Sequence, residues 1–588
     1  MIFKNKIHPI WVLFLVAILI VLPIYFNNTG MAFGDTYFHY NRIYEAAQQI
    51  RHNNFSFINL YSFQQSGRVV NQVYSPLLTY FFGGILLLVG NWFRFQVISI
   101  IVVCLLAGIF TYYGARRLEL TAKTSLIVAI MYMSSFSIFN FIYSTSWRGV
   151  AAMFIPLLVG PILDLYRGDW TWKSMFFLSI AISLITQAQI LAVTLILPIL
   201  VPFFVIGLIK STHKWRGVGF LSAAVVMAVV LNLNVVLPYV ELIKGNTILP
   251  PANFPLMEGV TNILVPFYDA APLSNVVISI LFFMSFAGLI LFWSRLGNFS
   301  KLVSIIGMVY MVLGTSLIPW SAVETSVPAL GNFLQLPRRF IIVGLLFLVL
   351  GAVLILRDLV ESSMHKVSFT IVDFMLTVFT IASVTSLMVT INDWNSQSRS
   401  NSAGLASGLA TEKVNVFAHK LDGKKISKII ELQPAFHSAN TGKLIHAVDR
   451  VTPDYTPIQK YSNKIDYYQL YVNYVIKPKN KFKHTVKKDG VMELTWNDSK
   501  AKTQDVPVVA YKNTQIKFNG KVLKHNHLKQ TAIGSLLLKS QKGLNRLQIS
   551  YVPNKLTLVG TAVALFGWII AGIVSIFYLI RKRYNKFG

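Results

Sequence analysis

Residues 10–26 read IWVLFLVAILIVLPIYF, an unbroken apolar run that follows Lys4 and Lys6. The run leads into Asn27-Asn28-Thr29 without a small-residue cleavage site, so we interpret it as an uncleaved first transmembrane helix rather than a signal peptide. Further runs along the chain approach the roughly 20 apolar residues that a bilayer core requires. The predicted spans are 10–26, 95–114, 125–143, 149–166, 173–186, 188–209, 217–239, 274–293, 301–318, 339–357, 369–391 and 556–580.

The composition also indicates a membrane protein. Of the 588 residues, 54% are hydrophobic and only 13% are charged, against about 25% charged residues in an ordinary soluble chain. This excludes a cytosolic enzyme and a disordered protein. The single cysteine, Cys104, excludes an internal disulfide and a multi-cysteine zinc site. The net charge of +30 would suggest nucleic acid in a soluble protein, but membrane topology and anionic partners also call for basic residues.

The distribution of basic residues predicts the topology. The apolar run 76–90 is short for a span, and we predict that it forms a helix in the outer interface. Counting it as a span would place Arg116 and Arg117 outside, against the positive-inside rule. Twelve spans put both termini in the cytosol and give inner loops with these basic residues: Arg116, Arg117, Lys123, Arg167, Lys173, Lys210, Lys214, Arg216, Arg295, Lys301, Arg357, Lys366, Arg581, Lys582, Arg583 and Lys586.

A polar stretch, 392–553, separates the last two spans. It holds 26 Lys and Arg against 11 Asp and Glu, which is half of the chain's positive surplus. Val506 to Tyr511 reads as a strand that Pro507 confines to an edge or a strand start. The runs 514–518 and 521–523 flank Asn519-Gly520, a strong hairpin signal. We therefore predict a β-rich domain rather than a disordered linker, with a flexible connection at Gly404 to Gly408.

These observations predict a polytopic α-helical membrane protein with about twelve transmembrane helices and an extracytoplasmic β-rich domain. Residues 1–391 would form the membrane domain, with an outer loop at 27–94. Residues 392–553 would form the basic β-rich domain, and residues 556–588 the last transmembrane helix and a cytosolic tail.

One carboxylate of the first outer loop stands out. If the segment that follows Gly34 is helical, Asp35, His39 and Arg42 share one face at i, i+4 and i+7. An acid, an imidazole and a guanidinium on one stripe can supply a base, a proton relay and a phosphate clamp. The alternative is that Asp35 only caps an interfacial amphipathic helix.

Arginines at the predicted outer ends of spans run against the positive-inside rule and need a reason. Arg148 opens the fourth span, and Arg338 with Arg339 opens the tenth. A lone arginine there often anchors a helix at the interface, but several beside one aspartate suit a lipid phosphate or diphosphate. Other polar residues predicted for the same side are Gln187, Gln189, Glu241 and Gln335.

Taken together, three motifs resemble the GT-C superfamily of integral membrane glycosyltransferases, and within it the YfhO-like and 6-pyruvoyl-tetrahydropterin synthase-related membrane proteins. The motifs are Gly34-Asp35 with Phe38-His39 and Arg42-Ile43, then Tyr74-Ser75-Pro76-Leu77, and finally Gln335-Leu336-Pro337-Arg338-Arg339-Phe340. In the tail, 517–521 and 543–547 resemble the β domain of YfhO-like proteins. Family members often carry a second acidic residue near the position of Arg148, which this chain lacks.

The resemblance implies a sugar transfer from a polyprenyl-phosphate donor at the outer leaflet, with Asp35 as the base. We expect Arg148, Arg338, Arg339, Arg42 and His39 to bind the donor phosphate, and direct displacement to invert the anomeric centre. We expect Tyr74, Gln187, Gln189, Glu241 and Gln335 to support the site, and we assign no metal, because a divalent ion has no support in the sequence.

The acceptor would be a cell-envelope molecule, and the basic domain suits an anionic polymer such as a teichoic acid, or anionic lipid headgroups. The alternatives are a transporter or flippase for polyprenyl-linked lipids and a non-catalytic adaptor of a sugar-transfer complex. Transporters tend to place ionisable groups near the bilayer midplane in repeated halves, whereas the polar residues of this chain gather at one predicted face.

Overall fold

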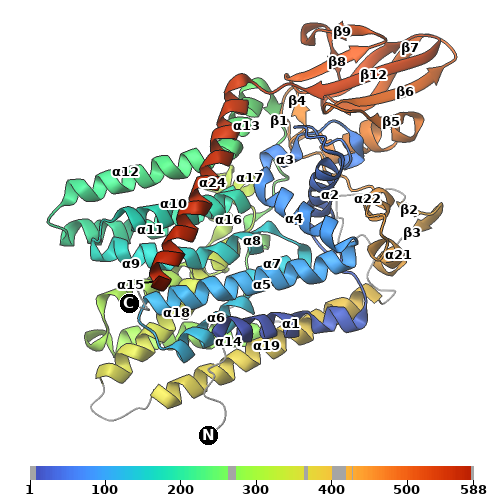
Figure 1. The fold of residues 1–588 in the computed structure, drawn as a ribbon. Helices are drawn as coiled ribbons and strands as arrows, with labels where there is room; N and C mark the ends of the chain where they lie inside the picture. The colour runs from blue at the N-terminus through green and yellow to red at the C-terminus, as the bar shows by residue number, and fades with distance from the viewer. Residues whose placement is uncertain (1–7, 263–272, 363–368, 400–418, 427, 585–588) are drawn as a thin grey trace. The chain divides into compact units, whose positions relative to one another are not determined.

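A computed structural model describes residues 8–262, 273–362, 369–399, 419–426 and 428–584. The connection predicted at Gly404 to Gly408 lies outside the described residues. The chain divides into two compact units (Figure 1). Unit 1 comprises 1–31, 96–225 and 252–400, and unit 2 comprises 32–95, 226–251 and 401–588.

Among the described residues, nine helices are long and apolar enough to cross a membrane. They cover Pro9–Asn27, Trp92–Arg117, Ala122–Ser144, Trp147–Arg167, Ile190–Lys210, Lys214–Leu231, Arg339–Ser362, Val372–Arg399 and Lys555–Tyr578. Three predicted spans form shorter apolar helices instead, at Trp172–Ala188, Val276–Leu291 and Asn298–Leu313. The polytopic helical fold is confirmed: among the described residues, nine of the twelve predicted spans form helices of spanning length and the other three form shorter apolar helices.

Two predicted boundaries also change. The predicted span 217–239 is two helices, α12 (Lys214–Leu231) and α13 (Leu233–Gly245), which break at Asn232. The side chain of Asn232 donates a hydrogen bond to Ala228 O at 2.7 Å, a local bond of the kind that competes with continued helix. In addition, α19 (Phe369–Arg399) continues eight residues beyond the predicted domain boundary at 391.

Unit 1 is built from helices packed on one another. Figure 1 shows α1 (Pro9–Asn27) beside α19, and the α19 side chain of Asn395 donates to Thr29 O at 3.0 Å just beyond α1. Its other helices are α5 (Trp92–Arg117, from residue 96), α6 (Ala122–Met133), α7 (Phe136–Ser144), α8 (Trp147–Phe154), α9 (Val159–Arg167), α10 (Trp172–Ala188), α11 (Ile190–Lys210), α12 up to residue 225, α14 (Leu273–Leu291), α15 (Asn298–Leu313), α16 (Trp320–Ser326), α17 (Leu330–Phe333) and α18 (Arg339–Ser362).

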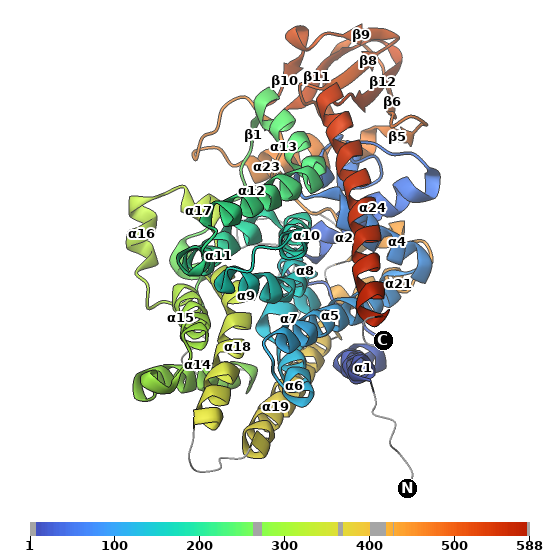
Figure 2. The ribbon, with the colours of Figure 1, turned by 60° about the vertical axis from the view of Figure 1, so that its left-hand side comes forward.

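Unit 2 joins the first outer loop to the carboxy-terminal part of the chain. Its helices are α2 (Thr36–His52), α3 (Val70–Val73), α4 (Pro76–Val89), α13, α21 (Gln433–Phe436), α22 (Gly442–Ala447), α23 (Tyr467–Tyr471) and α24 (Lys555–Tyr584). Figure 2 shows α13 lying beside α24. Gly560 permits this close contact, because a Cβ there would lie 2.1 Å from Leu237 Cδ1.

The strands of unit 2 are antiparallel. A five-stranded sheet has the order β5 (Lys483–Val486), β6 (Met492–Asp498), β12 (Gly543–Tyr551), β8 (Thr514–Phe518) and β9 (Lys521–Leu523). A three-stranded sheet has the order β10 (Lys529–Gln530), β11 (Ser535–Ser540) and β7 (Lys502–Val509). Two short pairs join β1 (Thr247–Ile248) to β4 (Pro457–Ile458) and β2 (His419–Leu421) to β3 (Lys424–Ile426).

Two strand predictions are confirmed. Strands β8 and β9 form the expected hairpin, with Asn519 at φ 47° and Gly520 at φ 85°, as a type I′ turn requires. Pro507 lies on β7, which is at the edge of its sheet, and the pairing shifts register across it between Val506 and Val509. The ladder therefore does not need the missing N–H of the proline.

The core of the β-rich part includes the first outer loop. Ile58, Leu60 and Val69 of this loop are buried against Met492, Val508 and other side chains of the sheets. Gly67 allows the close approach: it has φ 72°, and a Cβ there would lie 2.8 Å from Ile549 Cδ1. Residues of the loop 27–94 therefore form part of the main core of the two sheets.

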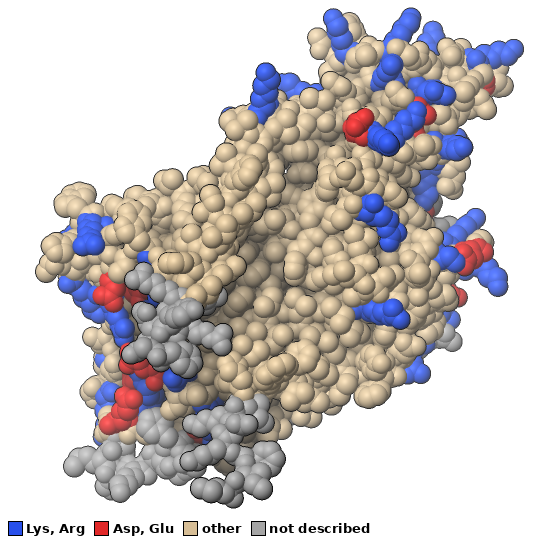
Figure 3. Space-filling model, in the orientation of Figure 1, with Lys and Arg blue, Asp and Glu red and all other residues tan. Residues whose placement is uncertain are grey.

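The surface of the β-rich part is basic. Figure 3 shows Lys and Arg side chains standing out over the strands, with few Asp or Glu side chains among them on this face. The exposed lysines include Lys517 and Lys521 on the β8–β9 hairpin. The positive surplus predicted from the sequence is therefore displayed on the surface of these strands.

Candidate functional site

The segment that follows Gly34 is helical, and helix α2 begins directly after Asp35. Asp35 occupies the N-cap position, but its side chain makes no capping hydrogen bond. About half of the side-chain surface of Asp35 is exposed (49%). The carboxylate is thus available for other contacts, which a capping role alone would not provide.

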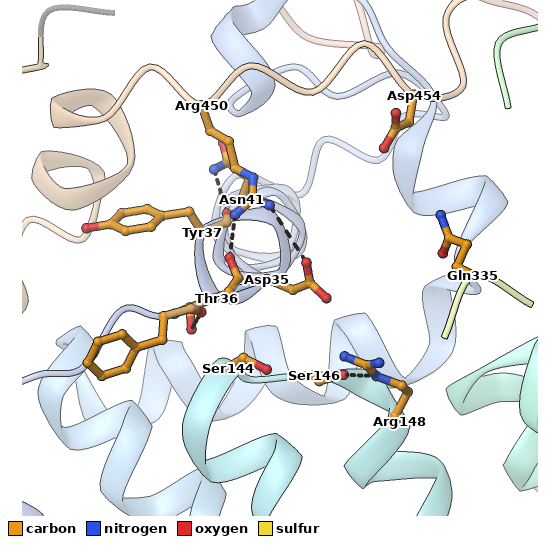
Figure 4. Close-up of polar contacts among 12 residues, drawn as sticks. Asp35, Thr36, Tyr37, Asn41, Ser144, Ser146, Arg148, Gln335, Arg450 and Asp454 are labelled. Carbon is orange, nitrogen blue, oxygen red and sulfur yellow. Dashed lines mark hydrogen bonds and ion pairs between the residues drawn. The ribbon is translucent and has the colours of Figure 1, made fainter. Parts of the chain in front are cut away.

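Arg450, which lies far along the chain, contacts this carboxylate within unit 2. Its Nη2 lies 3.7 Å from Asp35 Oδ1, and its Nη1 donates a hydrogen bond of 2.7 Å to Gly34 O (Figure 4). The Arg450 side chain is only 17% exposed. The guanidinium therefore holds the loop that carries Asp35 and also supplies a positive charge beside the carboxylate.

A second carboxylate, Asp454, belongs to the same cluster. It comes from the same segment as Arg450 and is close enough to Asp35 for their charges to interact. Tyr468 OH donates to Asp454 Oδ1 at 3.3 Å. Desolvation raises the pKa of Asp454, and the nearby charges of Arg68 and Arg450 oppose that increase. The structure thus supplies a second acid that the sequence near Arg148 lacked.

Arg68 supports the segment that carries Asp454. Its side chain is fully buried and donates hydrogen bonds to Thr452 Oγ1 at 3.1 Å and to the main-chain oxygen of Asp454. The guanidinium also lies over the rings of Phe63 and Tyr471. No local pattern ties Arg68 to Asp35, because the residues that link them lie nearly 400 positions further along the chain.

Arg42 has a different position from the one predicted. It is fully buried, and its Nη2 donates to Tyr74 O at 2.8 Å, Thr79 Oγ1 at 2.8 Å and Ser75 O at 3.3 Å. Burial lowers the pKa of Arg42 to about 9, which leaves the guanidinium charged at neutral pH. These carbonyl contacts give Arg42 a positioning role. The expectation that Arg42 binds the donor phosphate stays a prediction beside these contacts.

His39 and Tyr74 lie beside Arg42 in the same cluster. His39 is buried, and its Nδ1 lies 3.2 Å from Arg42 Nη1. A guanidinium has no acceptor, so the ring nitrogen accepts this bond and the proton resides on Nε2. Tyr74 OH lies 3.0 Å from Tyr455 OH, and burial raises the pKa of both phenols. Of the predicted residues, the structure brings Asp35, His39, Arg42 and Tyr74 into one region of unit 2.

Glu45 fixes the loop that faces α2. It is fully buried, and its two oxygens accept main-chain hydrogen bonds from Leu60 at 2.7 Å, Tyr61 at 2.8 Å and Ser62 at 3.0 Å. Burial raises the pKa of Glu45, and these hydrogen bonds oppose the increase. Glu45 therefore anchors this loop. Its spacing from Asp35 in the sequence did not indicate this role.

Glu241 belongs to another part of unit 2. Its carboxylate accepts hydrogen bonds from Tyr551 OH at 3.2 Å, Asn554 N at 3.2 Å, and the side chains of Asn513 and Thr557. It therefore joins α13 to the start of α24. The supporting role of Glu241 at the donor site stays a prediction.

Unit 1 contains the other predicted residues. Arg148 Nε donates to Ser146 Oγ at 2.9 Å, just before α8 (Figure 4). Arg148, Gln189 and Arg339 line one small cavity of about 10 Å³ together with apolar side chains of α8, α11 and α18. A cavity of this size holds about one water molecule. Three predicted residues from distant parts of the sequence thus lie around one cavity.

Arg339, the first residue of α18, holds the segment before this helix. Arg339 donates to Leu334 O at 2.7 Å and to Gln335 Oε1 at 2.9 Å, and Gln335 donates to Ala252 O at 2.8 Å. Gln335 has φ 57°, so this turn is strained and needs such support. Arg338 is partly exposed beside it, and Gln187 is fully buried in α10. Among the residues that the structure describes, no group of three His, Cys, Asp or Glu could hold a metal ion.

Comparisons with known proteins give a likeness of fold. No protein-family model matches the sequence, and no curated protein matches it. Among solved structures, the chain is similar to the arabinofuranosyltransferase AftD from mycobacteria, with a TM-score of 0.42, 14% identity, and coverage of 65% of this chain and 27% of that one. A mutant of the same enzyme gives a TM-score of 0.42, 15% identity, and coverage of 66% and 28%. The chain spans little more than a quarter of AftD's length.

Proposed function

We propose that this protein is a membrane glycosyltransferase that moves a sugar from a polyprenyl-phosphate donor to a cell-envelope acceptor at the outer leaflet. The observation that carries the proposal is Asp35, a half-exposed carboxylate directly after the first span, with Arg450 beside it. A carboxylate that is fixed in position, accessible and not used as a helix cap is suited to act as a general base. The resemblance of the surrounding motifs to GT-C enzymes supports the same role.

In the proposed reaction, a carboxylate oxygen of Asp35 accepts the proton of the acceptor hydroxyl. The hydroxyl oxygen attacks the anomeric carbon, the bond from that carbon to the phosphate oxygen breaks, and polyprenyl phosphate leaves with the electron pair. Because the acceptor displaces the phosphate directly, the anomeric centre is inverted. Arg450 orients Asp35 through the Gly34 carbonyl and limits its movement, which is the kind of preorganisation that lowers a barrier.

Asp454 has a proposed role in binding the acceptor. Its carboxyl lies near Asp35, and desolvation raises its pKa. Such a group can hydrogen-bond to a sugar hydroxyl next to the one that reacts. We therefore expect Asp454→Asn to raise KM for the acceptor more than it lowers kcat, whereas Asp35→Asn should lower kcat.

Donor binding is proposed for arginines of unit 1. Arg148 and Arg338 are both partly exposed, so each can meet a phosphate oxygen. Arg339 is already committed to the carbonyl of Leu334 and to Gln335, so we propose that it positions this turn. We expect Arg148→Gln to raise the KM for the donor while the melting temperature stays near that of the wild type.

The experiment that tests the proposal is Asp35→Asn in purified, reconstituted protein, assayed with a panel of polyprenyl-phosphate sugars and envelope acceptors. General-base catalysis contributes about 10²–10⁴-fold, so turnover should fall by that factor. Asp422→Asn is the matched control, since Asp422 is an exposed aspartate of the same unit. Turnover near the wild-type value in Asp35→Asn would refute the role of Asp35 and favour a non-catalytic adaptor.

The basic surface of the β-rich part is a proposed contact for an anionic acceptor, such as a teichoic acid, or for anionic lipid headgroups. Deleting the whole segment would expose Ile58 and Leu60 of the outer loop, which pack in its core. Lys517→Gln with Lys521→Gln is a cleaner test, because both side chains are exposed on the hairpin. Binding of the polymer should weaken and lose part of its salt dependence in this variant.

A further inference from the structure

A large cavity lies in unit 1, at the end of the helices where the sequence predicts cytosolic loops. Its volume is about 650 Å³, within the range of sites that bind small molecules. The cavity is bounded by the ends of α5, α9 and α11 and the beginnings of α10 and α12. The charged side chains that line it include Arg117, Arg167, Lys173, Lys210 and Arg216.

The walls of this cavity are fixed by close packing. Gly207 of α11 touches α9 so closely that a Cβ would lie 1.8 Å from Leu165 O. Trp170 Nε1 donates to Ser211 Oγ at 2.9 Å and so ties the α9–α10 loop to the α11–α12 loop. A Cβ on Gly217 would lie 2.6 Å from the ring of Trp170. The cavity is therefore preformed and does not depend on loops that must first close.

The charge of the lining is positive. Five Lys and Arg side chains face two carboxylates, Asp164 and Asp169. Asp164 is committed inside the wall, because Arg117 Nη2 contacts it at 2.6 Å and Ser174 Oγ donates to it at 2.5 Å. The positive-inside rule accounts for basic residues in these loops, but it does not require that they converge on one cavity.

Two helices, α10 and α12, begin at this cavity, and their first turns are basic rather than acidic. Helix N-termini are stabilised by acidic residues, because the helix dipole is positive there. Neither α10 nor α12 has an acidic residue in its first turn. Their first turns carry Lys173, Lys214 and Arg216 instead. Lys173 and Arg216 line the cavity, so a bound anion there would neutralise both cations.

We propose that this cavity is a binding site for a phosphate-bearing anion. Guanidinium groups, ammonium groups and helix N-termini are the three groups that proteins use most often to hold phosphate. The volume exceeds that of a single phosphate and suits a diphosphate or a phosphorylated headgroup. Such an anion can come from a lipid of the inner leaflet, which basic pockets between membrane helices bind, or from a soluble phosphate compound.

The test uses the full chain in nanodiscs of neutral lipid. One arm titrates soluble inorganic pyrophosphate, and the other replaces part of the neutral lipid with phosphatidic acid. The thermal midpoint and the binding isotherm are measured in both arms. We expect at least one probe to raise the midpoint of the wild-type protein, and Lys210→Gln with Arg216→Gln to weaken its binding by tenfold or more.

A matched control comes from the loop before α15. Lys210 and Arg216 lie over the rings of Tyr166 and Phe220, and in the same manner Arg295 and Lys301 lie over Phe292 and Trp293, outside the cavity. We expect Arg295→Gln with Lys301→Gln to change the affinity less than twofold.

Stabilisation by pyrophosphate identifies a soluble ligand, and stabilisation by phosphatidic acid alone identifies a lipid. No response to either probe, or an equal loss of affinity in the pocket and control variants, would overturn the proposal. If the double variant of the pocket does not fold, Lys173→Gln, an exposed position, serves in its place.

Discussion

Replacing Arg42 by Gln separates a positioning role from direct contact with the substrate. The guanidinium makes two strong hydrogen bonds, to Tyr74 O and Thr79 Oγ1 at 2.8 Å each, and a longer one to Ser75 O at 3.3 Å. Ser75 has φ 64°, so these bonds also hold a strained turn in front of α4.

The expected loss follows from these contacts. Hydrogen bonds to a charged group contribute about 1.5–3 kcal/mol each, and removing one partner of a buried charged network costs about 3–5 kcal/mol. We therefore expect Arg42→Gln to lower the free energy of unfolding by about 4 kcal/mol, and the melting temperature by on the order of 10 °C. Glutamine is too short to bridge all three acceptors, although Thr79 Oγ1 still donates to Ser75 O at 3.1 Å.

The assay is thermal unfolding in detergent followed by tryptophan fluorescence, with donor binding measured on the folded fraction. Arg51→Gln is the control, because Arg51 is exposed on the last turn of the same helix, and it should melt within about 1 °C of the wild type. If Arg42→Gln melts like this control but binds the donor phosphate poorly, then Arg42 contacts the substrate and the positioning role is wrong.

Three further substitutions probe the fold. Burial lowers the pKa of His484 to about 4, whereas a histidine in the unfolded chain has a pKa of about 6.5. The free energy of unfolding of the wild type should therefore fall by about 3 kcal/mol as the pH drops from 6.5 towards 4. His484→Gln should abolish this decrease in pH-dependent melts. Gly207→Ala should lower the melting temperature, since its Cβ would meet Leu165 O, whereas Gly219→Ala, with open space around it, should not. Gly520→Ala, at φ 85°, should cost about 1 kcal/mol in chemical denaturation of the hairpin.

Local patterns predicted local structure well. The hairpin at Asn519-Gly520 could be located because the turn chemistry depends on two adjacent residues. The placement of Pro507 on an edge strand follows in the same way from its missing N–H. The break at Asn232 was not predicted, because the apolar run continues through it and hydropathy does not register a single side chain that bonds to its own helix.

Only part of the candidate site could be predicted from the sequence. The spacing placed His39 and Arg42 on the helix that Asp35 precedes, but it could not tell that Arg42 turns inwards to carbonyl groups. Arg450 and Asp454 gave no local signal, since they lie in an irregular segment more than 400 residues after Asp35. Their importance depends on a tertiary contact, which no periodicity encodes.

The distance along the chain between Asp35 and Arg450 has a consequence for biosynthesis. The ribosome must add more than 400 residues after Asp35 before the segment that anchors its loop exists, which takes roughly 20–80 s at about 5–20 residues per second. Until then, the hydrophobic residues of the outer loop also lack the strands that cover them. A nascent chain shorter than this therefore holds its carboxylate unanchored, and the complete centre arises only when about three quarters of the polypeptide has been made.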